Sequence, residues 1–71
     1  MTTEEASNFI MPFGKYHGQT LDKIAETDDG LKYLFWLKDI RPNSGDIDKA
    51  LRIYCNITSI RNKYDNIMNE D

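Results

Sequence analysis

The residues best able to contact a phosphate or a protein partner are gathered in one short segment, Gly14-Lys15-Tyr16-His17-Gly18. Glycine adopts backbone angles that other residues resist, so two glycines can close a tight loop that presents Lys15, Tyr16 and His17. A lysine and exposed backbone N–H groups beside the start of a helix suit a phosphate. The alternative is a packed turn in which Tyr16 covers the core and Lys15 is only solvated.

Few residues could form a catalytic or metal centre. His17 is the only histidine and Cys55 the only cysteine, and one of each cannot build a zinc site within one chain. Asp28 and Asp29 are adjacent carboxylates, but they stand where the start of a helix favours an acceptor and a negative charge. We therefore expect no catalytic centre, no metal and no cofactor, with Cys55 a small side chain on a helix.

Basic side chains outside the glycine segment supply further candidate contacts to phosphates or to a partner. Lys23, Lys38 and Arg41 lie in the middle of the chain. A second, basic and polar stripe recurs further on at helical spacing: Lys49, Arg52, Asn56, Ser59 and Lys63. The formal net charge of −3 counts against tight, nonspecific DNA binding, because dedicated nucleic-acid binders are usually basic.

The last third of the chain also carries an apolar stripe. Its residues alternate at spacings of three and four, which is the a/d pattern of a helix that pairs with another helix: Ala50, Ile53, Ile57, Ile60, Tyr64 and Ile67. One hypothesis is that this stripe, from Ile53 onward, forms a helix-pairing interface. The other is that the whole stripe packs on its own domain.

The elements that must position these residues follow from periodicity and turn signals. The sequence predicts an α+β fold, mostly helical: a short N-terminal β-hairpin at 9–20, packed on three helices at 21–27, 29–40 and 45–68, the last one long. Residues 1–8 are expected to be a flexible leader before a single domain, 9–71. Pro12 lacks a donor N–H and belongs on an edge strand, Thr20 can cap a helix, and Pro42 ends the second helix.

The helix expected at 29–40 is apolar or aromatic nearly all round. A helix of this kind is normally covered on several sides, which predicts that it is the central helix of the domain. Trp36 lies within it. We therefore favour a core position for Trp36 over a platform on which a nucleic-acid base stacks.

Part of the chain is similar to a known small module. The segment from Met11 to Ala25 contains Phe-Gly-Lys-Tyr-His-Gly-Gln-Thr and is followed by Tyr33-Leu34-Phe35-Trp36-Leu37. Over residues 10–40 this resembles the exodeoxyribonuclease-X-like C-terminal module and the related family of quorum-sensing-regulated virulence factors. In the exonucleases the catalytic carboxylates belong to a separate nuclease domain. The resemblance therefore implies an accessory module that engages nucleic acid or proteins in DNA metabolism, without nuclease activity of its own.

Two functional hypotheses follow. The first is a small non-catalytic binding module, a protein-interaction adaptor or modulator of a DNA-processing enzyme, with a homodimer as one form of self-association. The alternative is a nucleic-acid-binding accessory module that contacts phosphates through the glycine segment and the basic helix stripe.

No apolar run approaches the ~20 residues that span a membrane, and the N-terminus lacks the features of a signal peptide. We expect no membrane partner and a cytoplasmic location, and the composition suits a phage gene.

Overall fold

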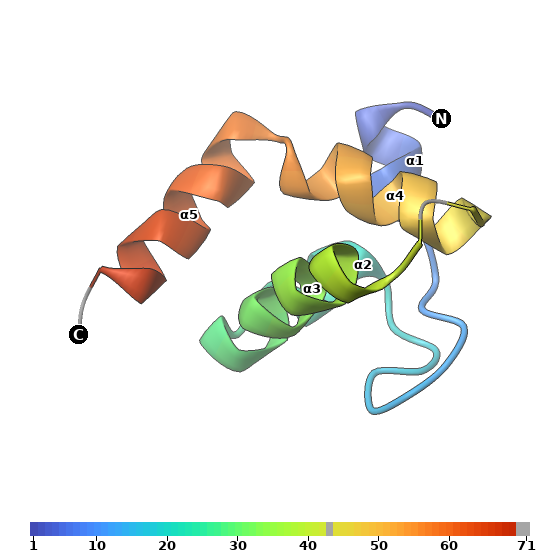
Figure 1. Cartoon of the computed structure of the whole chain (residues 1–71), viewed down its shortest axis with the longest axis horizontal. Coiled ribbons are helices and arrows are strands. Elements are labelled where there is room, and N and C mark those ends of the chain that lie inside the picture. Colours follow the sequence, from blue (N-terminus) through green and yellow to red (C-terminus); the bar gives the residue numbers. More distant parts are fainter. Residues whose placement is uncertain (43, 70–71) are drawn as a thin grey trace.

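The computed structural model describes residues 1–42 and 44–69, and these form five α-helices (Figure 1). Helix α3 is the longest, and it contacts α2, α4 and α5; α1 lies against α4 and α2. The helix bounds are α1 Thr3–Ser7, α2 Leu21–Ile24, α3 Asp28–Ile40, α4 Asp46–Cys55 and α5 Thr58–Met68. The chain is thus a small helical protein built around α3. None of these helices is both long and apolar enough to cross a membrane.

The predicted β-hairpin at 9–20 is wrong. The segment does double back, because the Met11 N–H donates to the Gln19 carbonyl at 2.8 Å and the Gly18 N–H donates to the Met11 carbonyl at 2.9 Å. Pairing stops there: within the described residues, the only β-type contact is one isolated antiparallel bridge between Ile10 and Thr20. Both glycines, Gly14 and Gly18, have positive φ, so the chain turns too tightly between them for two strands to form.

The segment expected to be a flexible leader contains helix α1. Its start is a capping box, in which the Glu5 N–H donates to the Thr2 hydroxyl and the Thr2 N–H donates to the Glu5 carboxylate. Ala6 is fully buried against the rest of the molecule. The Thr-x-x-Glu spacing of Thr2 and Glu5 is the sequence signal for this helix start.

The single long helix expected at 45–68 is also wrong, because the chain bends between α4 and α5 (Figure 1). The bend lies at Ile57, whose φ of −63° and ψ of 128° are extended, whereas Asn56 before it keeps a near-helical conformation. The bend turns α5 back toward α3. As a result, the two halves of the predicted apolar stripe pack on the same core rather than projecting away from it.

The core lies between α2, α3 and α4. Thr20 caps α2 by accepting from the Lys23 N–H, and Thr27 caps α3 by accepting from the Gly30 N–H. The Tyr54 hydroxyl, buried on α4, donates to the Asp22 carboxylate of α2 at 3.0 Å. The fully buried larger side chains come from every part of the chain except α1 and α5: Met11, Leu21, Ile24, Leu31, Leu34, Leu51, Tyr54 and Cys55.

The first turn of α3 packs tightly against the end of α2. A Cβ atom placed on Gly30 would overlap the backbone carbonyl of Ile24, and a backbone atom cannot swing aside as a side chain can. Gly30 is therefore required by packing, even though its own backbone conformation is an ordinary helical one.

We predict that Gly30→Ala destabilises the protein by about 2 kcal/mol or more, because α2 must shift away from α3 to admit the methyl group. The gain in helix propensity from Gly to Ala, about 1 kcal/mol, offsets only part of this cost. Lys32→Ala is the matched control, since Lys32 is exposed on the same helix, and its effect should stay within about 0.5 kcal/mol. Urea unfolding followed by circular dichroism measures both, and equal stability of the two variants would contradict the argument.

Candidate functional site

A row of aromatic side chains crosses the surface where the loop 9–20 meets α3. The rings of Tyr16 and Tyr33 have centroids 5.0 Å apart, and those of Tyr33 and Trp36 are 5.8 Å apart, both tilted. These distances are those of favourable aromatic pairs. We call Phe13, Tyr16, Tyr33 and Trp36 the aromatic surface. Trp36 is 54% exposed, so the expectation that it lies in the core is wrong.

The local sequence explains why these rings meet. Tyr33, Trp36 and Ile40 follow one another at spacings of three and four, so they lie on one face of α3, opposite the buried leucines. The loop reaches them through Gly14, whose φ is 78° and whose Cβ, if present, would stand 3.0 Å from the Tyr33 hydroxyl. The loop therefore covers one end of this face and leaves Trp36 and Ile40, each 54% exposed, in solvent.

Two cations border the aromatic surface. The Lys15 ammonium lies 5.5 Å from the centre of the Tyr16 ring, and the Arg41 guanidinium lies 4.9 Å from the centre of the Phe13 ring. Both distances are within the range of a cation–π contact. Lys15 and Tyr16 therefore lie together in the loop, as expected of a contact loop. Tyr16 is also half-buried, as expected of a packed turn.

Arg41 is held in place by a buried carboxylate. Its Nε donates to Asp48 Oδ1 at 2.7 Å, and the second oxygen of Asp48 accepts from the backbone N–H groups of Ser44 at 3.3 Å and Gly45 at 3.0 Å. Asp48 is only 4% exposed. The Arg41 hydrogen bond, helped by the two backbone donors, holds the pKa of the Asp48 carboxyl below its ordinary value. One carboxylate therefore joins the end of α3 to the start of α4.

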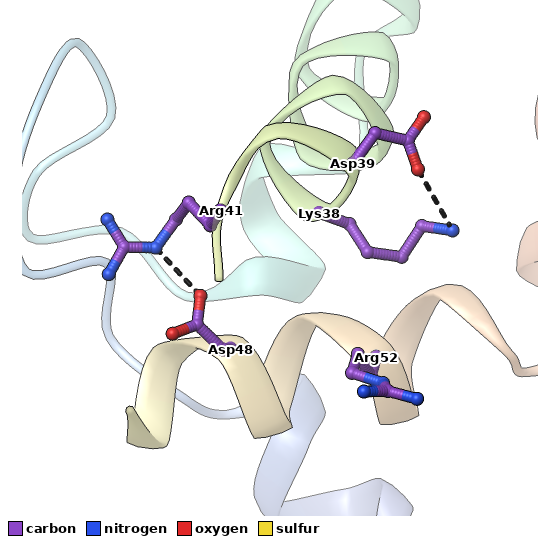
Figure 2. A pocket seen from close by; sticks show the side chains of 5 residues that line it. All are labelled: Lys38, Asp39, Arg41, Asp48 and Arg52. Carbon is purple, nitrogen blue, oxygen red and sulfur yellow. Dashed lines mark hydrogen bonds and ion pairs between the residues drawn. The ribbon is translucent and has the colours of Figure 1, made fainter. Parts of the chain in front are cut away.

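A hollow of about 290 Å³ opens beside this ion pair, lined by Lys38, Asp39, Arg41, Asp48 and Arg52 (Figure 2). Figure 2 shows that Arg41 and Lys38 point in opposite directions, Arg41 toward the loop and Lys38 toward Asp39. The Lys38 ammonium lies 3.5 Å from the Asp39 carboxylate. Three cations border the hollow, but two of them already face a carboxylate, which makes it at best a modest site for an anion.

The other predicted contact residues are dispersed. His17 is exposed at the tip of the loop, and Lys23 on α2 pairs at 3.5 Å with Glu26, which follows that helix. Lys49 lies with Arg52 beside a second hollow, of about 250 Å³, next to Met1 and Ile53. The predicted basic stripe on one helix is split by the bend at Ile57, which carries Lys63 away from Lys49 and Arg52.

Lys63 has a structural contact instead. Its ammonium donates to the backbone carbonyl of Ala25 at 2.8 Å, at the C-terminal end of α2, where a cation is favoured. On the same helix, the ring of Tyr64 stacks parallel on that of Phe35 with centroids 3.9 Å apart. The predicted helix-pairing residues are all partly buried against the protein's own core: Ile53, Ile57, Ile60, Tyr64 and Ile67.

The Cys55 thiol and the Tyr54 hydroxyl are both buried. Burial raises the pKa of the Cys55 thiol to about 11, so the thiol stays protonated at neutral pH. Burial, followed by the hydrogen bond to Asp22, also raises the pKa of the Tyr54 hydroxyl. In residues 1–42 and 44–69, no group of three or more His, Cys, Asp or Glu side chains is placed to hold a metal ion.

No protein family, curated protein or solved structure matches the chain. The resemblance of residues 10–40 to the exonuclease-associated module therefore stays a prediction.

Lys15, Tyr16 and Arg41 were predicted as contact residues from the sequence. That they lie beside Phe13, Tyr33 and Trp36 on one surface was not predicted. A signal was present, since Tyr33, Trp36 and Ile40 share a helical face that the leucines of α3 do not occupy. Asp48 carried a weaker signal. Its position three residues after Gly45 is the one from which a carboxylate reaches back to the start of a helix.

We predict that Asp48→Asn destabilises the protein most at neutral pH. The folded pKa of Asp48 is depressed, so its contribution is present above the unfolded value of 3.8 and is lost as the pH falls through the lower folded value. The difference in unfolding free energy between wild type and Asp48→Asn should therefore shrink on acidification. Urea unfolding of both proteins across this pH range measures it; Asp46→Asn, an exposed acid in the same turn, is the control. A difference that does not depend on pH would refute the role of the charge.

Proposed function

We propose that this protein is a small non-catalytic binding module that docks on a larger protein through its aromatic surface. The observation that carries the proposal is the exposure of Trp36 at 54% in a row of contacting aromatic rings. Tryptophan, tyrosine and arginine are the residues that dominate the binding energy of protein interfaces. This surface combines all three, with Ile40 exposed one turn beyond Trp36.

Several side chains of the surface already contact one another in the unbound protein. Tyr33 is fixed between Tyr16 and Trp36, and Arg41 is fixed by Asp48 and Phe13. Side chains that are already ordered lose little conformational entropy on binding, which favours affinity.

The charges beside the surface define the partner's chemistry. Lys15 lies against Tyr16 and Arg41 lies against Phe13, whereas Trp36 and Ile40 offer exposed apolar area on the outer face of α3. A complementary partner segment carries an apolar side chain for Trp36 and a carboxylate for Lys15, since Arg41 already pairs with Asp48. The resemblance of residues 10–40 is the ground for naming a DNA-processing enzyme as the owner of that segment.

The test is a selection from a random peptide library displayed on phage, with the immobilised protein as bait. Enriched peptides should share an apolar residue flanked by Asp or Glu. Binding of each peptide is then measured through Trp36 itself, which is the only tryptophan, so its fluorescence reports contact at this surface.

We predict that Trp36→Ala weakens binding of the enriched peptides by about 30-fold or more, as expected for a central aromatic anchor. Lys15→Glu should weaken binding by about threefold to tenfold, as a change at a charged border. Peptide anisotropy measures both variants. Arg61→Ala, exposed on α5, is the control and should bind as wild type. Peptides that bind Trp36→Ala as tightly as wild type would show that the aromatic surface is not the docking site.

A second candidate function is single-stranded nucleic-acid binding, favoured by Lys15 and Arg41, which contact rings of the aromatic surface. A base could stack on Trp36 with a phosphate at Lys15, while Lys38 and Arg52, which line the hollow beside Arg41, would contact phosphates further along the strand. The net charge of −3 places this candidate behind protein binding.

If nucleic acid binds, the affinity for a labelled single-stranded oligonucleotide should fall with salt with a logarithmic slope of about −2, since each of three phosphate contacts contributes about 0.7. Arg52→Glu should reduce the magnitude of that slope, and Arg61→Glu should not. Fluorescence anisotropy at several salt concentrations gives the slope. Lack of binding at low salt would remove this candidate and leave the protein-docking proposal unaffected.

A further inference from the structure

The bend between α4 and α5 depends on very little local structure. Asn56, with φ −88° and ψ −6°, is already near the helical region, and only Ile57 is clearly outside it. Rotating ψ of Ile57 from 128° to the helical value of about −42° would make α4 and α5 nearly continuous. A helix from Asp46 to Met68 would then be about 35 Å long at 1.5 Å per residue.

The bend contains none of the strong helix breakers, although Asn56 is a poorer helix former than alanine. Asn56, Ile57 and Thr58 include neither glycine nor proline, the two residues that usually interrupt a helix. Ile57 is the N-cap of α5, and its side chain makes no capping hydrogen bond. Isoleucine is among the poorest N-cap residues, whereas every other helix start in the described chain has an acceptor side chain nearby.

The spacing of apolar residues also continues unchanged across the bend. The spacing of three and four runs unbroken from Ala50 and Ile53 on α4 through Ile57 to the residues of α5. A pattern of this kind is typical of one continuous helix. The sequence thus favours a straight helix, and the observed bend must be maintained by what α5 touches.

Those contacts are few and sit on the surface of the core. Helix α5 has no fully buried residue. It is attached through the Tyr64 ring on Phe35, the Lys63 ammonium on the Ala25 carbonyl, and the partly buried Ile60 and Ile67. Phe35 lies on α3 and Ala25 directly follows α2, and α5 also contacts α4. Phe35 and Ala25 would be left uncovered if α5 swung away.

We propose that two copies of this chain exchange α5, so that each copy's straightened helix docks its α5 on α2 and α3 of the other copy. The exchange makes in trans the same contacts that the monomer makes within one chain, and it removes the uncapped bend. Domain swapping of this kind is a low-cost route to a symmetric dimer because no new interface has to be designed. The proposal is independent of the aromatic surface and of its partner.

Exchange also differs from simple pairing of two apolar stripes. Pairing the stripes would take Tyr64 off Phe35 and leave Phe35, now only 8% exposed, without its cover. In the exchanged dimer that ring is covered again, by Tyr64 of the second copy.

The first test is the oligomeric state of three proteins by sedimentation velocity over a wide concentration range. Wild type should show a dimer that increases with concentration. Thr58→Pro should be monomeric, because proline is tolerated at the first position of α5 but not inside a straight helix, and Ile57 already has the extended conformation that precedes proline. Its dimerisation should be weaker than that of wild type by about 100-fold or more.

Two further variants make this result specific. Asn56→Ala raises helix propensity at the bend in both copies and should tighten the dimer about fivefold to tenfold. Thr58→Ala fits both states and should dimerise as wild type does. Wild type and Asn56→Ala that remain monomeric at the highest concentration, or a Thr58→Pro variant that dimerises normally, would overturn the proposal.

The second test separates exchange from stripe pairing and does not depend on Thr58→Pro folding. Phe35→Leu and Tyr64→Leu each remove the stack, but one intact stack returns when the two variants exchange α5 with each other. Native mass spectrometry of the mixture should show more mixed dimer than the statistical share. A statistical distribution, or one with fewer mixed dimers, would exclude exchange.

Discussion

The carboxylate of Asp48 fixes the part of this molecule that the candidate site requires. It is almost fully buried, and its two oxygens accept from the Arg41 side chain and from two backbone N–H groups at the start of α4. A buried charge persists only when its hydrogen-bonding capacity is met by its neighbours. Because these donors come from both sides of the turn, the direction in which α4 leaves α3 and the position of the Arg41 guanidinium over Phe13 are set by the same group.

The two ends of α3 have opposite characters. At its start, Gly30 lets α2 pack backbone to backbone, which ties the helix into the core. Toward its end, Trp36 and Ile40 stay in solvent, since the loop 9–20 covers only one end of this face. The same helix therefore serves as the centre of the core and as the base of the exposed aromatic row. A substitution on its outer face can change binding without disturbing the packing on its inner face.

The sequence correctly predicted those features that neighbouring residues determine, namely helix caps, helix ends and turns. Thr20 caps a helix, Pro42 follows the end of α3 at Ile40, and the two glycines mark a chain reversal. The errors arose where tertiary contacts decide. Turn residues show that a chain reverses but not that strands pair beside it, and the bend at Ile57 has no local signal because contacts of α5 maintain it. The exposure of Trp36 was missed because hydrophobicity alone does not say which face of an apolar helix its neighbours cover.

Cys55 lies at the last residue of α4, directly before the bend, and is buried and protonated. A thiol in this state reacts with an alkylating reagent only when the structure around it opens. The rate at which Cys55 is alkylated therefore reports how often the structure opens at the junction of the two helices. Since Cys55 is the only cysteine, this measurement needs no added label, and the signal comes from this one position.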